Sequence, residues 1–205
     1  MKKINYFMKD TEENVLGPYK RFILWLYGCH RNCDGCIFHK TDDGIYNSVS
    51  VSEIVDEIIS NHDVEGITIS GGEPFDQGEA LLELVTSVRE KTSLGIIIYT
   101  GYTYKELLKN STWSEILDNV DLIIDGEYVK SLDMGNSLIG SSNQKVIFLT
   151  NRYKDKLHLY ERNNHRVNTV NILDNEIHTI GIPVDGIEAI VRAIKRTNSN
   201  RKGDA

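Results

Sequence analysis

The sequence contains a short apolar run, Phe22-Ile-Leu-Trp-Leu-Tyr27, that leads into Cys29-His30-Arg31-Asn32-Cys33-Asp34-Gly35-Cys36. The apolar run is typical of a buried strand, and the second stretch holds all three cysteines of the 205-residue chain. A disulfide framework favours an even number of cysteines, and a closed zinc site needs four ligands. Three thiolates on one tight loop suit a cubane iron–sulfur cluster with one iron left for a non-protein ligand. We therefore expect the chemistry at this cysteine loop, residues 29–36.

Two structural interpretations compete with a cluster. His39 follows Cys36 at the spacing of a ligand pair, so the three cysteines and His39 could form a Cys3His zinc site. Zinc sites more often take two ligand pairs from separated parts of a chain, whereas these four residues lie close together. Three buried, inert cysteines are the other interpretation. We favour the cluster and keep a zinc-stabilised binding module without enzymatic activity as the alternative, with His30 and His39 not acting as cluster ligands.

Apolar strands alternate with helical patterns along most of the chain. Strands are predicted at 22–27, 66–70, 95–99, 121–125 and 145–150, and helices at 51–60, 79–91, 104–108 and 113–117, with Ser52 as the first N-cap. This alternation indicates an α/β fold with mainly parallel strands covered by helices. The first three strands end in the cysteine loop, in Gly71-Gly72-Glu73-Pro74 and in Thr100-Gly101. Ligands of parallel sheets bind at the carboxyl ends of strands, so we expect these three loops to converge.

The remainder of the chain predicts an appendage to the same domain. Residues 165–173 and 176–182, separated by Asp174-Asn175, have the pattern of an antiparallel hairpin, and a helix is predicted at 186–196. We therefore expect one domain over 1–196, with a core at 14–150, an appendage at 151–196 and a flexible tail at 197–205.

Composition restricts the class of protein. The chain is 40% hydrophobic and 26% charged, as in ordinary globular proteins, and its formal net charge of −7 argues against direct nucleic-acid binding. The N-terminus lacks a signal-peptide pattern, and no apolar run approaches the roughly 18 residues of a membrane span. We expect a cytoplasmic protein without membrane association, where cysteine clusters more often bind metal than form disulfides.

The C-x3-C-x2-C spacing, followed by Gly-Gly-Glu-Pro after the next strand, resembles the radical S-adenosylmethionine (radical SAM) superfamily. The resemblance implies a partial (β/α)6-type radical SAM barrel, carrying the C-terminal hairpin and helix. It also implies a [4Fe-4S] cluster held by Cys29, Cys33 and Cys36, and S-adenosylmethionine (SAM) on the open iron. In that superfamily, reductive cleavage of SAM yields a 5′-deoxyadenosyl radical.

The superfamily's contacts with SAM can be carried over to matching positions. Gly71, Gly72 and Glu73 would line the methionine end, and Gly35 would offer its backbone to the adenine. Thr100 and Asp125 are candidates for the carboxylate and the ribose hydroxyls. Asp125 fits equally well as a turn-capping residue before Gly126.

Further motifs are similar to the activating proteins of anaerobic (class III) ribonucleotide reductases. Asn14-Val-Leu-Gly-Pro-Tyr-Lys-Arg21 resembles the GPG-x-R lead-in of glycyl-radical activating enzymes, with Tyr19 replacing the final glycine. Residues 33–36, 99–107, 121–128 and 140–144 resemble successive motifs of the same family, although no physical argument assigns a role to Ser141, Asn143 and Gln144. Tyr102 and Tyr104 are interpreted as surface aromatics.

This family resemblance implies a macromolecular substrate. The target would be a glycine Cα–H on a large glycyl-radical reductase subunit, and the electron would come from a donor such as flavodoxin or ferredoxin. One departure is the segment Cys36-Ile-Phe-His-Lys-Thr41, which lacks the Asn-Pro pair common in the family. Radical SAM chemistry on a peptide or a nucleotide-derived small molecule is therefore the alternative.

Overall fold

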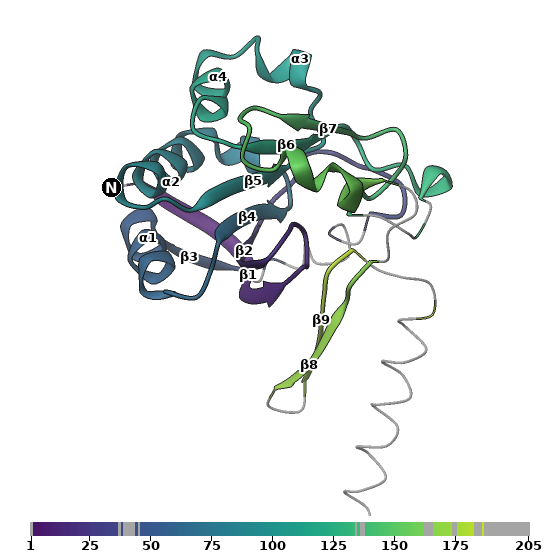
Figure 1. Cartoon of the computed structure of the whole chain (residues 1–205), viewed down its shortest axis with the longest axis horizontal. Coiled ribbons are helices and arrows are strands. Elements are labelled where there is room, and N and C mark those ends of the chain that lie inside the picture. Colours follow the sequence, from purple (N-terminus) through teal and green to yellow (C-terminus); the bar gives the residue numbers. More distant parts are fainter. Residues whose placement is uncertain are drawn as a thin grey trace, which may run out of the picture.

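The computed structural model describes residues 2–36, 38, 44, 46–133, 135, 138–161, 166–173, 176–182 and 186. It contains a mixed β-sheet whose helices lie over one face (Figure 1). His39, the turn predicted at 174–175, the helix predicted after residue 186 and the tail at 197–205 lie outside the described residues.

Seven strands form the main sheet in the order β3-β1-β2-β4-β5-β6-β7. The four central strands are parallel to one another: β2 (Lys20–Leu26), β4 (Gly66–Gly71), β5 (Gly95–Tyr99) and β6 (Leu122–Asp125). The flanking strands run antiparallel to their neighbours: β1 (Lys3–Glu13), β3 (Asn47–Ser50) and β7 (Lys145–Phe148). The predicted parallel arrangement is confirmed for the centre of the sheet, and the sheet as a whole is mixed.

The flanking strands explain where the sequence prediction was incomplete. Strands β1 and β3 were not predicted, because the second half of β1 is mostly charged and lacks an apolar alternation. Strand β7 was predicted without a direction. Among the described residues between β6 and β7, the helical element is the short 3-10 helix η3 (Lys130–Leu132), and an antiparallel partner needs no crossover helix.

Four α-helices cover one face of the central strands (Figure 1): α1 (Val51–Ser60), α2 (Gly78–Lys91), α3 (Tyr104–Leu107) and α4 (Ser111–Leu117). The predicted helices are confirmed with small shifts at their ends. Ser50, not Ser52, caps α1, because its side chain accepts from the Glu53 amide while the Glu53 carboxylate accepts from the Ser50 amide. This reciprocal capping box makes Val51 the first residue of the helix, one position before the predicted cap Ser52.

The strand residues alternate between two apolar layers. In β5, Ile96 and Ile98 pack with the buried faces of the helices, whereas Ile97 belongs to a separate cluster with Leu122 and Tyr153. The second face is covered by irregular segments and by the 3-10 helix η4 (Lys154–Tyr160), whereas the 3-10 helix η2 (Pro74–Gln77) packs on the face that carries the α-helices. The placement of the described α-helices over one face is compatible with a barrel-like fold, although the strand order does not close the sheet.

Arg21 is a fully buried arginine at the amino edge of the parallel strands. Its guanidinium donates to the Glu65 carboxylate at 3.0 Å and to the Tyr153 hydroxyl at 2.9 Å. It also donates to the carbonyl of Gly95 at 3.0 Å. A Cβ on Gly66 would lie 2.7 Å from the guanidinium, so a glycine is needed there. Since a buried charge is tolerated only with full pairing, these bonds hold the amino ends of the strands together.

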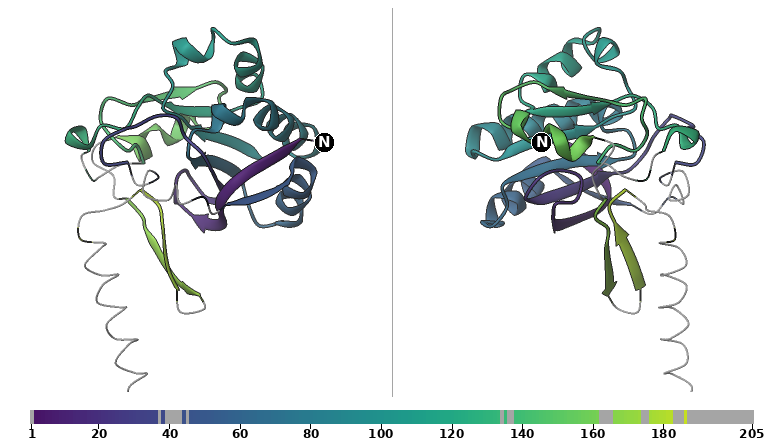
Figure 2. Two further views of the ribbon diagram at one scale, coloured as in Figure 1. Left: turned by 180° about the vertical axis from the view of Figure 1, so that it is seen from behind. Right: turned by 45° about the vertical axis from the view of Figure 1, so that its right-hand side comes forward.

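The C-terminal hairpin is confirmed as strands β8 (Thr169–Leu173) and β9 (Glu176–Ile180), paired antiparallel. It projects away from the main sheet in every view of Figures 1 and 2. Its base is anchored, because Ile180 is buried against Ile23 and Trp25, and because Arg166 donates to Asp133 at 2.7 Å. These contacts, and the bond from the Thr169 hydroxyl to the Glu12 carboxylate at 2.8 Å, attach the base of the hairpin to the rest of the domain.

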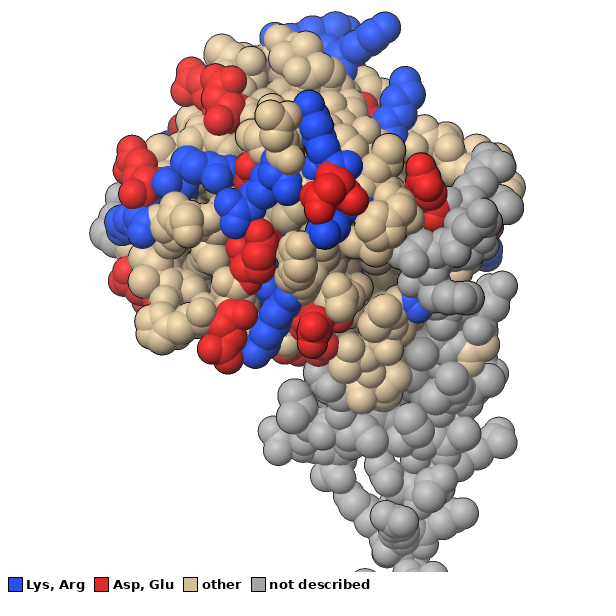
Figure 3. All heavy atoms as spheres, in the orientation of Figure 1, with Lys and Arg blue, Asp and Glu red and all other residues tan. Residues whose placement is uncertain are grey.

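The surface carries both signs of charge. On the face shown in Figure 3, Lys and Arg lie among Asp and Glu, and neither sign dominates. No helix in the part of the chain that the structure describes combines the length and apolar character needed to span a bilayer.

Tyr19 occupies a backbone conformation that suits glycine. Its φ is +63°, in the left-handed region, and it stands where the lead-in motif has its final glycine. Asn14 and Leu16, in the same turn, also have positive φ. A left-handed non-glycine residue costs about 1–2 kcal/mol, so this turn stores backbone strain.

Tyr19→Gly should therefore be less destabilising than Tyr46→Gly, by about 1 kcal/mol in the free energy of unfolding. The two rings are similarly exposed, and each makes one close contact, to Lys156 at 5.4 Å and to Tyr27 at 4.6 Å respectively. Only Tyr19 is left-handed. Urea denaturation of the two variants measures the difference, and equal destabilisation would show that the Tyr19 backbone is not strained.

Candidate functional site

Four loops meet at the carboxyl edge of the sheet because the four central strands are parallel. The cysteine loop follows β2, Gly71-Gly72-Glu73-Pro74 ends β4, Thr100-Gly101 follows β5 and Gly126 follows β6. The predicted convergence of the first three loops is confirmed by contacts between them, and the loop after β6 joins them.

The glycine pair after β4 packs directly on the base of the cysteine loop. The Gly72 amide donates to the Leu26 carbonyl at 2.7 Å, and the Glu73 amide donates to the Gly28 carbonyl at 2.9 Å. A Cβ on Gly72 would collide with the Gly28 carbonyl, and Gly71 has a φ of +100°. The two glycines are therefore required by backbone approach and backbone conformation.

Glu73 is a buried carboxylate that joins two of the loops. It is 1% exposed and accepts from the Thr100 hydroxyl and the Gly101 amide, both at 2.8 Å. It also accepts from the amide of Phe75 at 3.1 Å. Burial raises the pKa of Glu73 to about 7, although these hydrogen bonds favour the charged form. Glu73 thus links the end of β4 to the end of β5.

Arg31 lies between the first two cysteines and reaches across the neighbouring loops. Its guanidinium pairs with Glu127 after β6, faces Glu73 at 3.8 Å and lies over the Tyr102 ring at 4.1 Å. Only 12% of its side chain is exposed. The interpretation of Tyr102 as a surface aromatic was wrong, because its half-buried ring contacts Arg31, His30 and Trp113.

His30 makes a second set of contacts from the same loop. Its Nδ1 lies 2.6 Å from Asp76, and its Nε2 lies 3.3 Å from the Tyr102 hydroxyl. The Tyr102 hydroxyl also donates to Asp76 at 3.3 Å. Consecutive residues of the cysteine loop therefore contact the same tyrosine ring.

The three cysteines are free thiols. Cys29 is exposed and the other two are half-buried, and the Cys36 amide donates to the Cys33 carbonyl at 3.2 Å in a tight turn. Gly35 in this turn has a φ of +74° and lies against the Lys130 side chain. Burial raises the pKa of Cys29 to about 11, with nearby carboxylates adding to the shift, so metal binding at this thiol releases a proton.

A single metal ion and an iron–sulfur cluster require different arrangements of the three thiols. Among the described residues, no three His, Cys, Asp or Glu side chains are gathered closely enough to hold one metal ion. A single zinc ion needs its thiolates about 2.3 Å away, whereas a cubane cluster spreads three thiolates over three irons. Three thiolates on one loop can thus occupy three irons of such a cluster. The fourth ligand of the zinc alternative, His39, is outside the described residues.

Thr100 and Asp125, predicted at the SAM site, both have protein partners. Thr100 donates to Glu73, as described, and Asp125 is 4% exposed and accepts from the Tyr104 amide at 2.7 Å. The carboxylate of Asp125 thus holds the start of α3 against the end of β6. Both residues lie at the predicted edge.

The segment 140–144 gains a physical role. Gln144 donates to the Gly126 carbonyl and Asn143 to the Glu127 carbonyl, each at 2.8 Å, while Ser141 accepts from the Val129 amide at 3.0 Å. These three side chains fix the backbone that runs from Gly126 past the cysteine loop. Sequence reasoning also missed Arg31, Asp76 and Glu127, for which the only signal is that they flank the strand ends.

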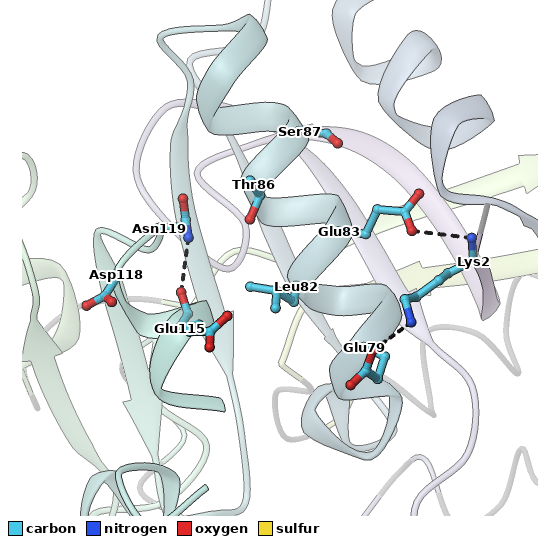
Figure 4. Close-up of a pocket in the computed structure, with 9 residues that line it drawn as sticks. All are labelled: Lys2, Glu79, Leu82, Glu83, Thr86, Ser87, Glu115, Asp118 and Asn119. Atoms are coloured by element: carbon cyan, nitrogen blue, oxygen red, sulfur yellow. Dashed lines mark hydrogen bonds and ion pairs between the residues drawn. The ribbon is translucent and has the colours of Figure 1, made fainter. Parts of the chain in front are cut away.

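A separate groove lies between α2 and α4, on the helix side of the sheet (Figure 4). Four of its nine lining residues are acidic: Glu79 and Glu83 on α2, Glu115 on α4 and Asp118 just after α4. The Lys2 ammonium pairs with Glu79, and the Lys2 backbone amide donates to the Glu83 carboxylate. None of the lining residues belongs to the four loops.

Comparisons with known proteins identify relatives. Residues 15–147 match a family described as a 4Fe-4S single cluster domain. The anaerobic ribonucleoside-triphosphate reductase-activating protein of Enterobacteria phage T4 is 30% identical over 139 residues, 64% of this chain and 86% of the phage protein. The protein of that name from Escherichia coli K12 is 31% identical over 154 residues, 70% of this chain and 97% of the relative. The one from Vibrio cholerae is 30% identical over 152 residues, with the same coverage.

The pKa of Glu73 predicts a pH dependence of stability. A carboxyl group with a raised pKa stabilises the fold while it is protonated. Its contribution is complete below the ordinary value near 4.5 and is lost as the pH rises through about 7. The Glu73→Gln side chain stays neutral at every pH. The free energy of unfolding of this variant should therefore rise by about 3 kcal/mol, relative to that of the natural protein, between pH 4.5 and pH 8.

Urea unfolding of the cluster-free protein at both pH values measures this effect. Glu106→Gln is the control, since hydrogen bonds from Thr103 lower the pKa of Glu106. Removal of this carboxylate should therefore change the stability difference from the natural protein in the opposite direction as the pH rises. A stability difference between Glu73→Gln and the natural protein that does not change with pH would contradict the prediction.

Proposed function

The chain belongs to the family of anaerobic ribonucleoside-triphosphate reductase-activating proteins, and on this premise we propose that it is a radical SAM enzyme that generates a glycyl radical on an anaerobic ribonucleotide reductase. The observation that carries the proposal is the position of the three thiols. They lie on one loop at the edge where the loops after β4, β5 and β6 converge.

Cys29, Cys33 and Cys36 would hold a [4Fe-4S] cluster, leaving one iron for SAM. The chemistry that a bound cluster supplies is transfer of one electron to SAM, which breaks a carbon–sulfur bond to give methionine and a 5′-deoxyadenosyl radical; that radical takes a hydrogen atom from glycine and becomes 5′-deoxyadenosine. The electron would come from a protein donor such as flavodoxin or ferredoxin.

The loops around the cysteines would bind and orient SAM. The backbone of Gly71 and Gly72 and the adjoining Glu73 would line the methionine end, and the backbone of Gly35 would meet the adenine. Thr100 and Asp125 would act near the carboxylate and ribose hydroxyls, and their contacts with Glu73 and the Tyr104 amide would hold them in place. Burial of Glu73 keeps a carboxyl group with a pKa near 7 beside this site.

The substrate would be a glycine in a loop of a large reductase subunit. A macromolecular substrate needs an accessible site, and the exposure of Cys29 supports this. We place the catalytic core within 14–150 of a single domain over 1–196, and we interpret the open sheet, with helices on one face, as the partial (β/α)6-type barrel.

A second candidate substrate is a peptide or a nucleotide-derived small molecule. The match to the cluster-domain family ends at residue 147, whereas the hairpin starts at Thr169 and lies outside it. An element beyond the shared core could serve a different target, so the chemistry of the core and the identity of the substrate need separate tests.

Anaerobic reconstitution with iron and sulfide should load about four iron atoms per chain. Reduction in the presence of SAM should then yield methionine and 5′-deoxyadenosine, and Cys33→Ala should abolish both products. Thr86→Ala, in the groove between α2 and α4, is the control and should keep full activity. Bound zinc without iron or SAM cleavage would refute the radical mechanism.

The substrate is tested by adding the anaerobic reductase of the same organism. A glycyl radical detected by electron paramagnetic resonance, dependent on Cys33, is the expected result. SAM cleavage that leaves the reductase without a radical would favour the second candidate.

A further inference from the structure

We propose that Arg31 is a positioning residue that fastens the first half of the cysteine loop to the Tyr102 ring before any cluster is bound. Arg31 touches neither SAM nor iron in this proposal; it acts by fixing where Cys29 and Cys33 stand. The proposal rests on the proposed function only in calling these cysteines ligands, because the fastening itself is a property of the protein alone.

The contacts of Arg31 reach all three neighbouring loops. Its guanidinium pairs with Glu127 from the loop after β6 and faces Glu73 at 3.8 Å from the end of β4. It lies 4.1 Å from the centre of the Tyr102 ring, in the loop after β5. A planar guanidinium can pair with carboxylates and stack on an aromatic face at the same time, which an ammonium does poorly.

The loop after β5 leaves space for the Arg31 side chain. A Cβ on Gly101 would lie 2.6 Å from Cδ of Arg31 and 2.9 Å from its Nε. The absence of a side chain at position 101 therefore makes room for the arginine. Nε of Arg31 is buried and makes no hydrogen bond, so the ion pair with Glu73 and the tyrosine ring compensate its burial.

The Tyr102 ring is a rigid support. Its centroid lies 4.5 Å from that of Trp113 in α4, and Trp113 packs edge-on against Phe75, which is 1% exposed. His30 and Asp76 both contact the Tyr102 hydroxyl, and they are joined to each other through His30 Nδ1. The cysteine loop is thus connected to the helix layer through one aromatic column.

The test uses the cluster-free protein, so it needs neither iron nor SAM. Trypsin cleaves after arginine, and its rate at the Arg31–Asn32 bond, followed by mass spectrometry, reports whether Arg31 is held. Tyr102→Ala should speed this cleavage about tenfold or more, because the ring is lost, whereas Tyr102→Phe keeps the ring and should stay close to the natural protein. Equal cleavage in the natural protein and Tyr102→Ala would overturn the proposal.

A second measurement tests the consequence for the site. Arg31→Ala should slow iron uptake during reconstitution several-fold and alter the electron paramagnetic resonance spectrum of the reduced cluster, and Arg31→Lys should restore little of either. The matched control is Arg152→Ala, which removes an arginine that also pairs with a glutamate and lies over a tyrosine ring, but at the amino edge. Equal effects of Arg31→Ala and Arg152→Ala would overturn the proposal, since the effect would then be loss of general stability.

Failure of the proposed function has a different signature. If the natural protein takes up no iron, the reconstitution result refutes the cluster, while the trypsin result still decides whether Arg31 is fastened. If iron and SAM cleavage are normal but the Arg31–Asn32 bond is cut freely, the fastening is refuted and the proposed function is unaffected.

Discussion

The parallel pairing of β2 with β4 continues beyond the ends of the strands, and the site depends on that continuation. The amides of Gly72 and Glu73 donate to the carbonyls of Leu26 and Gly28, so the loop after β4 is bonded to the base of the cysteine loop. This approach is possible only because position 72 has no side chain. Glu73 then turns inward and binds the loop after β5, which fixes how the loops after these two paired strands lie relative to each other.

At each end of the parallel strands, an arginine pairs with a carboxylate and contacts a tyrosine. At the amino edge, fully buried Arg21 pairs with Glu65 and the Tyr153 hydroxyl. At the carboxyl edge, Arg31 pairs with carboxylates and lies over Tyr102. The two arrangements differ in exposure and surroundings. Arg21 also donates to backbone carbonyls of the strands and holds them together, whereas Arg31 holds a loop that carries cysteines.

The sequence was sufficient for the features that depend on local pattern. The apolar runs predicted β2, β4, β5 and β6, helical spacing predicted α1 and α2, and parallel strand order predicted which loops would meet. The same argument predicted that the cysteine loop and the Gly71-Gly72 pair would lie together at the carboxyl ends of neighbouring strands. The matching relatives agree with the family that these motifs resemble.

Features that depend on contacts distant in sequence could not be predicted. Strand β1 is recognisable only once β2 and β3 are placed beside it, because nine of its eleven residues are partly or fully exposed and five are charged. The role of Arg31 depends on a ring about seventy positions later, and that of Gln144 on a carbonyl at Gly126. The partner of a polar residue leaves no periodic pattern in the sequence. Its role can therefore be recognised only in the three-dimensional structure.

The exposure of Cys29 has a consequence for the conditions in which the protein can work. A residue open enough to meet a loop of another protein is equally open to dissolved gases, and thiolates with iron are readily oxidised by dioxygen. An opening that admitted a large substrate to a cluster on this loop, as we propose, would thus admit dioxygen as well. With a cluster bound there, the enzyme would be confined by its architecture to anoxic surroundings.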